Sequence, residues 1–597
     1  MNDVQALDLS LKSRRNYNRF LLFVSGLGGL LYGVDIGIIA SALPYLEATS
    51  GFTQAQLSSI VAAVLLGSVF STLFAGWLAD LLGRRTLMAI SGCLFVASIP
   101  TIALSHGFEA LVLGRLLQGV SAGFIGVVVP LYLAECLTAT DRGKGTGIFQ
   151  WLLTLGIVAA AVIGAYYSFR VDDVAKLADA AALLAYKEQA WRRIFWVSLP
   201  PGVLFVIGSF LVAESPRWLF RRARHADARA ALLRSRAPDE AELELREMAG
   251  AATSEGETKT SIKSAFEEPL LSRKYVIPFV LACVILACNQ ATGVNSIIGY
   301  STTILLQGGL SDLQAHSGYL ILTVVNFCVT MAGVALVDRK GRKFLLSLGS
   351  AGIIVSLVFV GVLFHQAEDR RVDCRAAIAI DADQTAHVVF NAATASTFLA
   401  NARAPGSEGP SSLVVIYSYG DFHAASKAIR SDDPAPTPLV LNRDGCVPAN
   451  RTIAFFRNPF ADFDAARTAP LKIEHALVTP VPSAGHGWLT AVGIFVFMAF
   501  FAIGPGVCVW LALSELMPTR IRSNGMSIAL LINQAVSTGI AGVFLPTVGR
   551  FGYSTMFFLF AGCTIVYFLT AFFFLPETKG KTLEEIEAHF SRLRTEA

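Results

Sequence analysis

The sequence carries little charge for its length. Of its 597 residues, 15% are Asp, Glu, Lys or Arg, whereas 54% are hydrophobic and 41 are Phe. Soluble domains carry about 25% charged residues, so this composition excludes an ordinary soluble multidomain enzyme. The net charge of +4 is small and its basic residues are scattered, which leaves no basic patch for nucleic acid. We expect the chain to reside in a lipid bilayer.

The motifs of several enzyme classes are also absent. No Gly-x-x-x-x-Gly-Lys-Ser/Thr loop occurs, and no strand precedes the glycine-rich segment 26–33, so no nucleotide site is predicted. The nine cysteines lack metal-ligand spacing. We therefore expect no metal, no organic cofactor and no enzymatic activity.

Long apolar stretches dominate what is present. Segments such as Ile60–Ala79 and Val492–Leu513 are apolar all round over about the 20 residues that cross a bilayer. Hydropathy predicts an all-α integral membrane protein with spans near 19–45, 57–80, 86–105, 110–137, 143–168, 192–213, 273–306, 314–338, 343–365, 487–516, 523–549 and 553–575.

Basic residues predict the orientation of these spans. Segment 1–18 is polar and basic, without a cleavable signal, so we expect a cytoplasmic amino terminus. The short loops that then face the cytoplasm contain Arg84, Arg142, Arg342 and Arg522. This distribution follows the positive-inside rule.

A duplication divides the chain into two halves. Asp80-Leu-Leu-Gly-Arg-Arg85 corresponds to Asp338-Arg-Lys-Gly-Arg-Lys343 at an offset of 258 residues, and Glu135 corresponds to Glu515 at an offset of 380. The second half therefore contains an insertion. The predicted segments are a cytoplasmic amino terminus (1–18), a six-helix bundle (19–213), a cytoplasmic helical linker (214–272), helices 7–9 (273–365), an insertion (366–486), helices 10–12 (487–575) and a cytoplasmic carboxyl terminus (576–597). Duplicated six-helix halves are typical of alternating-access carriers.

The insertion 366–486 follows helix 9 and is therefore expected outside the cytoplasm. Its strand-like runs Ala386–Phe390 and Leu413–Tyr419 favour a small ordered domain over a bare linker. Its two cysteines, Cys374 and Cys446, are candidates for a disulfide, and two free thiols fit the sequence equally well.

Asp35 in the first span and Arg115 in the fourth lie at similar depths in the membrane. Ionisable residues inside spans are costly and are functional candidates by default. Burial favours a neutral carboxyl group, whereas the arginine favours an ionised one. A structural ion pair and a proton site are both compatible with this pattern.

Uncharged polar residues form a second candidate site. Carboxamides both donate and accept hydrogen bonds, as every hydroxyl of a sugar does, and an indole ring stacks on apolar sugar faces. Interhelical hydrogen bonding is the alternative role for each of them. Breaks are expected beside this site at Thr292-Gly293 and Gly504-Pro505-Gly506, and close helix packing at Gly26, Gly28, Gly29 and Gly33. The candidates are Gln150, Asn289, Gln290, Asn295, Asn326, Trp510, Asn533 and Gln534.

Acids and bases accompany one another at the cytoplasmic helix ends. We predict charge networks that latch the state closed on that side and break when it opens; orientation signals alone are the alternative. The residues are Asp80, Arg84, Arg85, Glu135, Arg142, Glu214 and Arg217, with Asp338, Arg342, Glu515 and Arg522 in the second half.

These motifs together resemble the sugar porter family of the major facilitator superfamily. The resemblance rests on Gly-Gly-Leu-Leu-Tyr-Gly-Val-Asp35, Asp80-Leu-Leu-Gly-Arg-Arg, Gly114-Arg115, Pro130-Leu-Tyr-Leu-Ala-Glu135, Glu214-Ser-Pro-Arg-Trp218 and Pro576-Glu-Thr-Lys-Gly-Lys. It covers nearly the whole chain apart from 366–486. It implies the major facilitator fold.

The same resemblance implies roles for individual residues. It assigns sugar contacts to Gln150, Gln290, Asn295, Asn326, Trp510 and Asn533, and places Tyr32 in the cavity wall. Asp35 stands where proton-coupled members carry Asp and passive facilitators carry Asn, and Arg115 is its partner in coupling. Asn289, Gln534 and Ala502 depart from the common pattern, which leaves the particular sugar open.

The sequence thus predicts a transporter that imports a monosaccharide, hexose or pentose, with protons as the coupling ion. A passive uniporter and a sugar-sensing receptor are the alternatives. We expect a monomer in a bacterial inner membrane, with sugar, protons and lipid as its partners and no nucleic acid.

Overall fold

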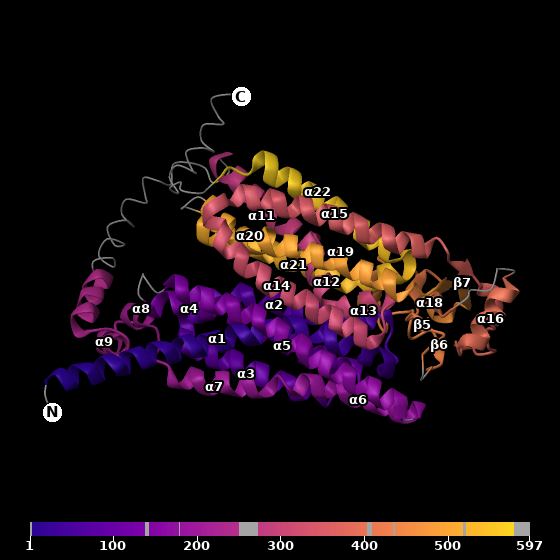
Figure 1. The fold of residues 1–597 in the computed structure, drawn as a ribbon, viewed down its shortest axis with the longest axis horizontal. Helices are drawn as coiled ribbons and strands as arrows, with labels where there is room; N and C mark the ends of the chain where they lie inside the picture. The colour runs from indigo at the N-terminus through magenta and orange to yellow at the C-terminus, as the bar shows by residue number, and fades with distance from the viewer. Residues whose placement is uncertain are drawn as a thin grey trace.

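The computed structural model describes residues 3–137, 142–177, 179–249, 273–402, 409–433, 436–517 and 521–577. Two helical bundles lie side by side, the N-terminal half from indigo to magenta and the C-terminal half from pink to yellow (Figure 1). The N-terminal half consists of α1 (Asp3–Ser50), α2 (Gln54–Leu82), α3 (Arg84–Ala103), α4 (Phe108–Cys136), α5 (Arg142–Leu177), α6 (Ala180–Trp196) and α7 (Leu199–Leu211). Short helices α8 (Pro216–Arg221) and α9 (His225–Leu233) follow it.

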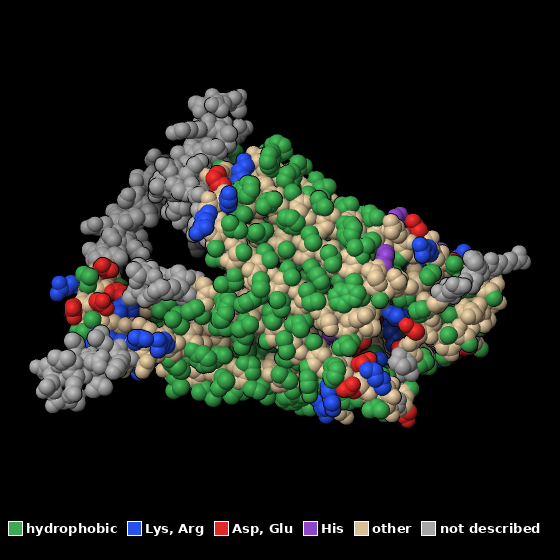
Figure 2. Space-filling model, viewed as in Figure 1, with side chains coloured by type: hydrophobic (Ala, Val, Ile, Leu, Met, Phe, Trp, Pro, Cys, Tyr) green, Lys and Arg blue, Asp and Glu red, His purple; other side chains and the backbone are tan. Residues whose placement is uncertain are grey.

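The C-terminal half repeats this arrangement. It consists of α11 (Arg273–Ala291), α12 (Val294–Gly299), α13 (Ser301–Gln307), α14 (Asp312–Lys340), α15 (Arg342–Glu368), α19 (Ala484–Ile503), α20 (Pro505–Leu516), α21 (Arg522–Phe551), α22 (Tyr553–Leu569) and η2 (Thr570–Phe574). Twelve helical segments of the described chain are long and apolar enough to cross a membrane. Figure 2 shows their apolar side chains as a broad band, with charged side chains gathered at its two ends. The predicted all-α membrane architecture is confirmed.

Two helices extend well beyond their predicted spans. α5 continues to Leu177 instead of ending near 168, and α6 starts at Ala180 instead of 192. The added turns contain Asp172, Lys176 and Glu188 among helix-favouring Ala and Leu. Hydropathy detects only the apolar part of a helix, so it misses such polar extensions.

Both predicted helix breaks are present. Gly293 separates α11 from α12 and adopts φ +81°, a conformation that other residues rarely adopt. Gly504 separates α19 from α20 just before Pro505. Glycine also allows α1 and α5 to pack closely. A Cβ on Gly33 of α1 would lie 1.8 Å from the Leu153 carbonyl oxygen of α5, so no larger residue fits there.

The insertion folds as a small α/β domain between α15 and α19. Its main sheet has the order β1-β7-β3-β4, with β5 also paired to β3, and β2 pairs with β6 in a second sheet. The long strands β3 and β7 are antiparallel, with Val414 opposite Leu477. The elements are β1 (Val372–Asp373), η1 (Arg375–Ala377), β2 (Ala386–Val388), α16 (Ala392–Asn401), β3 (Ser411–Tyr419), β4 (Phe422–Ala425), β5 (Ile429–Arg430), β6 (Leu439–Leu441), α17 (Arg451–Arg457), α18 (Phe463–Thr468) and β7 (Leu471–Pro480).

The candidate disulfide is not formed. Cys374 and Cys446 are both buried free thiols. Cys374 follows β1 and donates its backbone N–H to Ala476 of β7, whereas the Cys446 thiol donates to the Phe422 carbonyl oxygen of β4. β1 and β4 are the opposite edges of the sheet, with two strands between them. At about 4.8 Å per strand, this separation is too large for a disulfide.

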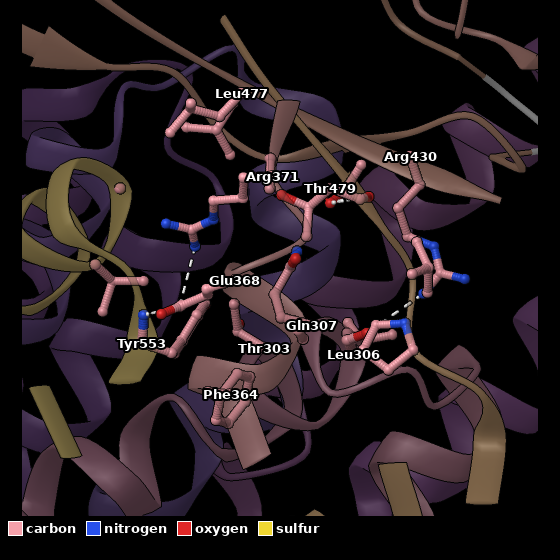
Figure 3. A pocket seen from close by; sticks show the side chains of 18 of the residues that line it. Thr303, Leu306, Gln307, Phe364, Glu368, Arg371, Arg430, Leu477, Thr479 and Tyr553 are labelled. Carbon is pink, nitrogen blue, oxygen red and sulfur yellow. Dashed lines mark hydrogen bonds and ion pairs between the residues drawn. The ribbon is translucent and has the colours of Figure 1, made fainter. Parts of the chain in front are cut away.

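The insertion rests on both halves at one end of the bundle, which we call the insertion end; the opposite end, where α8 and α9 lie, is the linker end (Figure 1). Arg430 donates to the Leu306 carbonyl oxygen of the C-terminal half at 3.3 Å, and Asp433 lies 4.0 Å from the Lys187 ammonium of the N-terminal half. A cavity of about 70 Å³, with polar and apolar side chains in its wall, lies at this junction. Figure 3 shows its wall of side chains from α13, α15, α22 and the insertion.

A disulfide between the insertion and the N-terminal half is expected to block transport. The insertion is continuous with α15 and α19 of the C-terminal half. When the two halves separate at this end, the insertion must therefore move away from α2 of the N-terminal half. A Cβ on Gly445 would lie 3.2 Å from the Thr53 Cγ2 atom at the start of α2, which suits a disulfide. Oxidised Thr53→Cys/Gly445→Cys should lose uptake and regain it on reduction, in a background lacking the exposed Cys93 and Cys328.

The matched control links the insertion to its own half. A Cβ on Gly549 of α21 would lie 2.6 Å from the Ala425 Cβ atom, so this pair must move apart by about 1 Å to reach the Cβ separation of a disulfide. Oxidised Ala425→Cys/Gly549→Cys should keep its uptake. Two results would contradict the separation of the insertion from α2 during transport. One is an equal loss of uptake in both oxidised variants, and the other is full uptake by oxidised Thr53→Cys/Gly445→Cys.

Candidate functional site

Hydrogen bonds join the two halves at the insertion end. Tyr319 of α14 donates to the Gly37 carbonyl oxygen of α1 at 2.9 Å, and Thr302 of α13 donates to that of Ala40. Ser58 of α2 accepts from the Leu545 N–H of α21 at 3.2 Å. Backbone carbonyl groups of α1 and the Ser58 side chain of α2 thus form hydrogen bonds with α13, α14 and α21, which closes the pathway at this end.

At the linker end the charge network lies within the N-terminal half. The Arg84 guanidinium, 2% exposed, lies 2.8 Å from both Asp80 and Glu135. Glu214 accepts from the backbone N–H groups of Arg84 and Arg85 at 2.9 and 3.0 Å. The network therefore joins α2, α3, α4 and the start of α8 in the state that is closed at the insertion end. Within the described residues it is intact there and does not bridge the two halves.

The second half repeats part of this arrangement. Glu577 accepts from the backbone N–H groups of Arg342 and Lys343 at 3.1 and 3.2 Å, as Glu214 does in the first half. Arg217 forms no ion pair with the described residues, and its Nε atom has no hydrogen-bond partner there. The side chains of Arg142, Asp338, Trp510, Glu515 and Arg522 lie outside the described part of the chain.

Replacing Glu135 with Gln is expected to destabilise the protein. The substitution keeps the shape of the side chain but leaves Arg84 buried beside a neutral group, which costs about 2–3 kcal/mol of unfolding free energy. The control is Asp80→Asn, because Asp80 is 62% exposed and should contribute less than about 1 kcal/mol. Thermal denaturation in detergent should rank the variants in this order, and equal melting temperatures would refute the buried network.

Asp35 and Arg115 meet inside the N-terminal half, as predicted. Both are 1% exposed, and the Arg115 Nη1 atom lies 3.7 Å from the Asp35 Oδ1 atom. Arg115 also donates to Gln118 at 2.6 Å and lies 5.7 Å from the Phe195 ring centre. Neither oxygen of Asp35 has a hydrogen-bond partner among the described residues. This carboxyl group is close to its counter-charge but lacks the donors that normally stabilise a buried carboxylate.

A carboxamide cluster lies at the break between α11 and α12. Asn295 donates to the Gln290 side-chain oxygen at 2.9 Å, and Gln290 donates to the Asn533 side-chain oxygen of α21 at 3.2 Å. Asn295 also donates to Ser537 at 2.8 Å. Three of the predicted sugar contacts therefore form one connected group. Ser537 was not predicted, although its position one turn after Asn533 was the available signal.

The other predicted contacts form no hydrogen bond with this group among the described residues. Asn289 is 2% exposed and donates to the Pro505 carbonyl oxygen at 3.4 Å, so it points toward the helix break and away from Gln290. Consecutive residues of a helix point about 100° apart, which explains the difference. Gln150 is exposed on α5, and Asn326 of α14 accepts from Thr330 at 3.4 Å. Tyr32 lies beside Gln534, across the two halves.

The sequence comparison identifies the family. The family model described as "Sugar (and other) transporter" matches residues 21–398 and 471–590. The chain belongs to this sugar transporter family. The internal gap in this match, residues 399–470, contains most of the insertion domain. This transporter therefore combines a family body with an additional domain at one end.

Individual relatives support the same assignment. The transporter is 31% identical over 356 residues to the galactose-proton symporter of Escherichia coli, which covers 59% of this chain and 71% of that protein. It is 26% identical to the human proton myo-inositol cotransporter, over 98% of this chain and 84% of that protein. The inward-open structure of the E. coli xylose transporter XylE is similar in fold, with a TM-score of 0.62 and 19% identity over 95% of this chain and 98% of that one.

Proposed function

We propose that this transporter is a proton-coupled importer of a monosaccharide or a similar polyhydroxylated ring. Proton-coupled carriers of galactose and of myo-inositol are among its relatives by name. The observation that carries the proposal is Asp35, which is buried beside Arg115 with neither oxygen hydrogen-bonded among the described residues. Such a carboxyl group gains stability by binding a proton. It therefore suits a group that alternates between charged and neutral forms.

The carboxamide cluster supports the sugar part of the proposal. Without a ligand, Gln290, Asn295 and Asn533 satisfy one another by hydrogen bonds. A sugar hydroxyl both donates and accepts, so it can replace each of these bonds without leaving a buried group unpaired. The cluster joins α11, α12 and α21, and its rearrangement on binding would connect the ligand to the contacts between the halves.

The described state fits one stage of an alternating-access cycle. The insertion end is closed by bonds between the halves, whereas the bonds at the linker end lie within one half. The basic loops assign the linker end to the cytoplasm. This is the stage at which sugar and proton leave toward the cytoplasm. We place the protein, as a monomer, in a bacterial inner membrane.

The direct test is uptake into proteoliposomes. Labelled glucose, xylose, galactose, fructose and myo-inositol are supplied with and without an inward proton gradient. Accumulation of one of them above its external concentration, abolished by an uncoupler, is expected. Equilibration that is independent of the gradient would instead show a passive uniporter.

A further inference from the structure

A buried histidine lies at the junction of the two halves near the insertion end. His316 of α14 is fully buried, and its ring stacks on that of Tyr45 of α1 with 5.4 Å between the ring centres. Its Nδ1 atom lies 3.0 Å from the Asp312 carbonyl oxygen, one turn earlier on α14. Its Nε2 atom lies 3.2 Å from the Ser41 carbonyl oxygen of α1. One nitrogen therefore contacts each half.

Both neighbours of the ring nitrogens are acceptors. A carbonyl oxygen accepts hydrogen bonds and cannot donate them, and a neutral imidazole has only one N–H group. In a neutral His316, one nitrogen lone pair would face a carbonyl oxygen at hydrogen-bond distance. A protonated ring donates at both positions. The closed junction therefore matches the imidazolium form.

A carboxylate supplies the counter-charge. The Asp312 Oδ1 atom lies 3.5 Å from the His316 Nδ1 atom. Its other oxygen accepts from the Tyr45 hydroxyl at 2.8 Å and from the Ser168 hydroxyl of α5 at 2.6 Å. Two donors from the N-terminal half thus stabilise the ionised Asp312. The charge pair itself lies within α14, but the two donors to its carboxylate are present only while the halves are joined here.

The remaining groups around the ring are uncharged. Gly164 of α5 lies beside the ring: a Cβ added to Gly164 would lie 3.4 Å from the His316 Cδ2 atom. Tyr319 on α14 is bonded to the Gly37 carbonyl oxygen, and Thr302 on α13 to that of Ala40. Tyr186 of α6 lies near Tyr45. Further along α1, Glu47 accepts from Gln54 and faces Lys427 of the insertion.

We propose that His316 is a second proton site, which binds a proton from the insertion side and thereby favours closure of that end. Because Ser41, Tyr45 and Ser168 belong to the other half, the proton and the closed state must stabilise each other to the same extent. The proton enters and leaves on the same side. It therefore controls the gate and does not add to the number of protons carried with the sugar. The proposal extends the proposed function and does not depend on Asp35.

The test measures the opening of the insertion end directly. Spin labels are placed on the exposed positions Glu109 and Thr555, one in each half near this end, in full-length protein in lipid nanodiscs. In Asp35→Asn protein, the open population should fall between pH 8 and pH 5. In Asp35→Asn/His316→Gln protein, this pH dependence should disappear. A dependence that survives His316→Gln, or that is already absent in Asp35→Asn, would overturn the proposal.

Two further variants check the assignment of the pH dependence to His316. His365→Gln is the matched control, because His365 is exposed at the end of α15 and pairs with Asp369 four residues away at 3.6 Å. It should leave the pH dependence unchanged. Asp312→Asn, which keeps the histidine, should lower the pH midpoint of closure by at least about one unit. An unchanged midpoint would overturn the proposal even if His316→Gln fails to fold.

Transport separates this proposal from the proposed function. His316→Gln should keep the wild-type accumulation ratio and change only the pH dependence of the initial uptake rate. A lower accumulation ratio would instead place His316 on the path of the coupled proton and contradict its role as a gate site. Loss of coupling in Asp35→Asn is read from accumulation, and gate closure is read from the distance between labels. Each claim can therefore fail while the other holds.

Discussion

Replacing Asp35 with Asn is expected to abolish accumulation of the sugar while leaving exchange of sugar across the membrane intact. Asn keeps the size of the side chain but cannot bind or release a proton. The uncoupled carrier should therefore bring sugar only to equal concentrations on both sides, a change from many-fold accumulation to a ratio of about one. Asp35 lies 3.7 Å from Arg115 and accepts no hydrogen bond among the described residues, so the substitution removes the counter-charge of Arg115 but breaks no hydrogen bond.

Accumulation and counterflow in the same proteoliposomes measure the two effects. Asp369→Asn is the control, since this residue is 65% exposed at the end of α15 and should accumulate sugar as the wild type does. Asp35→Glu retains a carboxyl group and should recover part of the accumulation. Normal accumulation by Asp35→Asn would reduce the pair with Arg115 to a structural role.

Replacing Gln290 with Ala is expected to weaken sugar binding by roughly 10- to 100-fold. The side chain connects Asn295 to Asn533, so its loss breaks one hydrogen bond of each carboxamide and removes a donor and an acceptor from the ligand. A site built to hydrogen-bond hydroxyl groups loses about 1–3 kcal/mol per missing partner. Titration of the sugar by calorimetry, together with the KM for uptake, should show the change.

The neighbouring residue is the matched control for this experiment. Asn289 contacts the Pro505 carbonyl oxygen at the break of α19 and α20. Asn289→Ala should lower the melting temperature and leave the sugar affinity within about threefold of the wild type. A large loss of affinity in Asn289→Ala with none in Gln290→Ala would reverse the assignment of these two side chains.

The fold was predictable because its signals are periodic and long. Twelve apolar segments, basic loops and a motif repeated in both halves define the helices and their order. The extensions of α5 and α6 were missed because residues such as Asp172 and Glu188 lower the hydropathy without ending a helix. The insertion was predicted as an ordered domain, and β2 and β3 lie at its two strand-like runs.

The site was predictable only as a set of residue types. Sequence alone cannot distinguish Asn289 from Gln290, because the direction of a side chain depends on how α11 packs against α20 and α21. The same limit applies to Cys374 and Cys446, whose separation depends on the order of strands in the sheet. The cluster of Tyr45, Asp312 and His316 was missed entirely. Its members lie on different halves and come together only in the folded protein.

The central claim is that sugar and proton enter together. Proteoliposomes that contain a pH-sensitive dye and receive labelled sugar from outside, without an imposed gradient, report both fluxes at once. We expect sugar entry to acidify the lumen in the wild type and not in Asp35→Asn, while labelled sugar enters in both. Sugar entry into wild-type vesicles with no change in lumenal pH would contradict proton coupling.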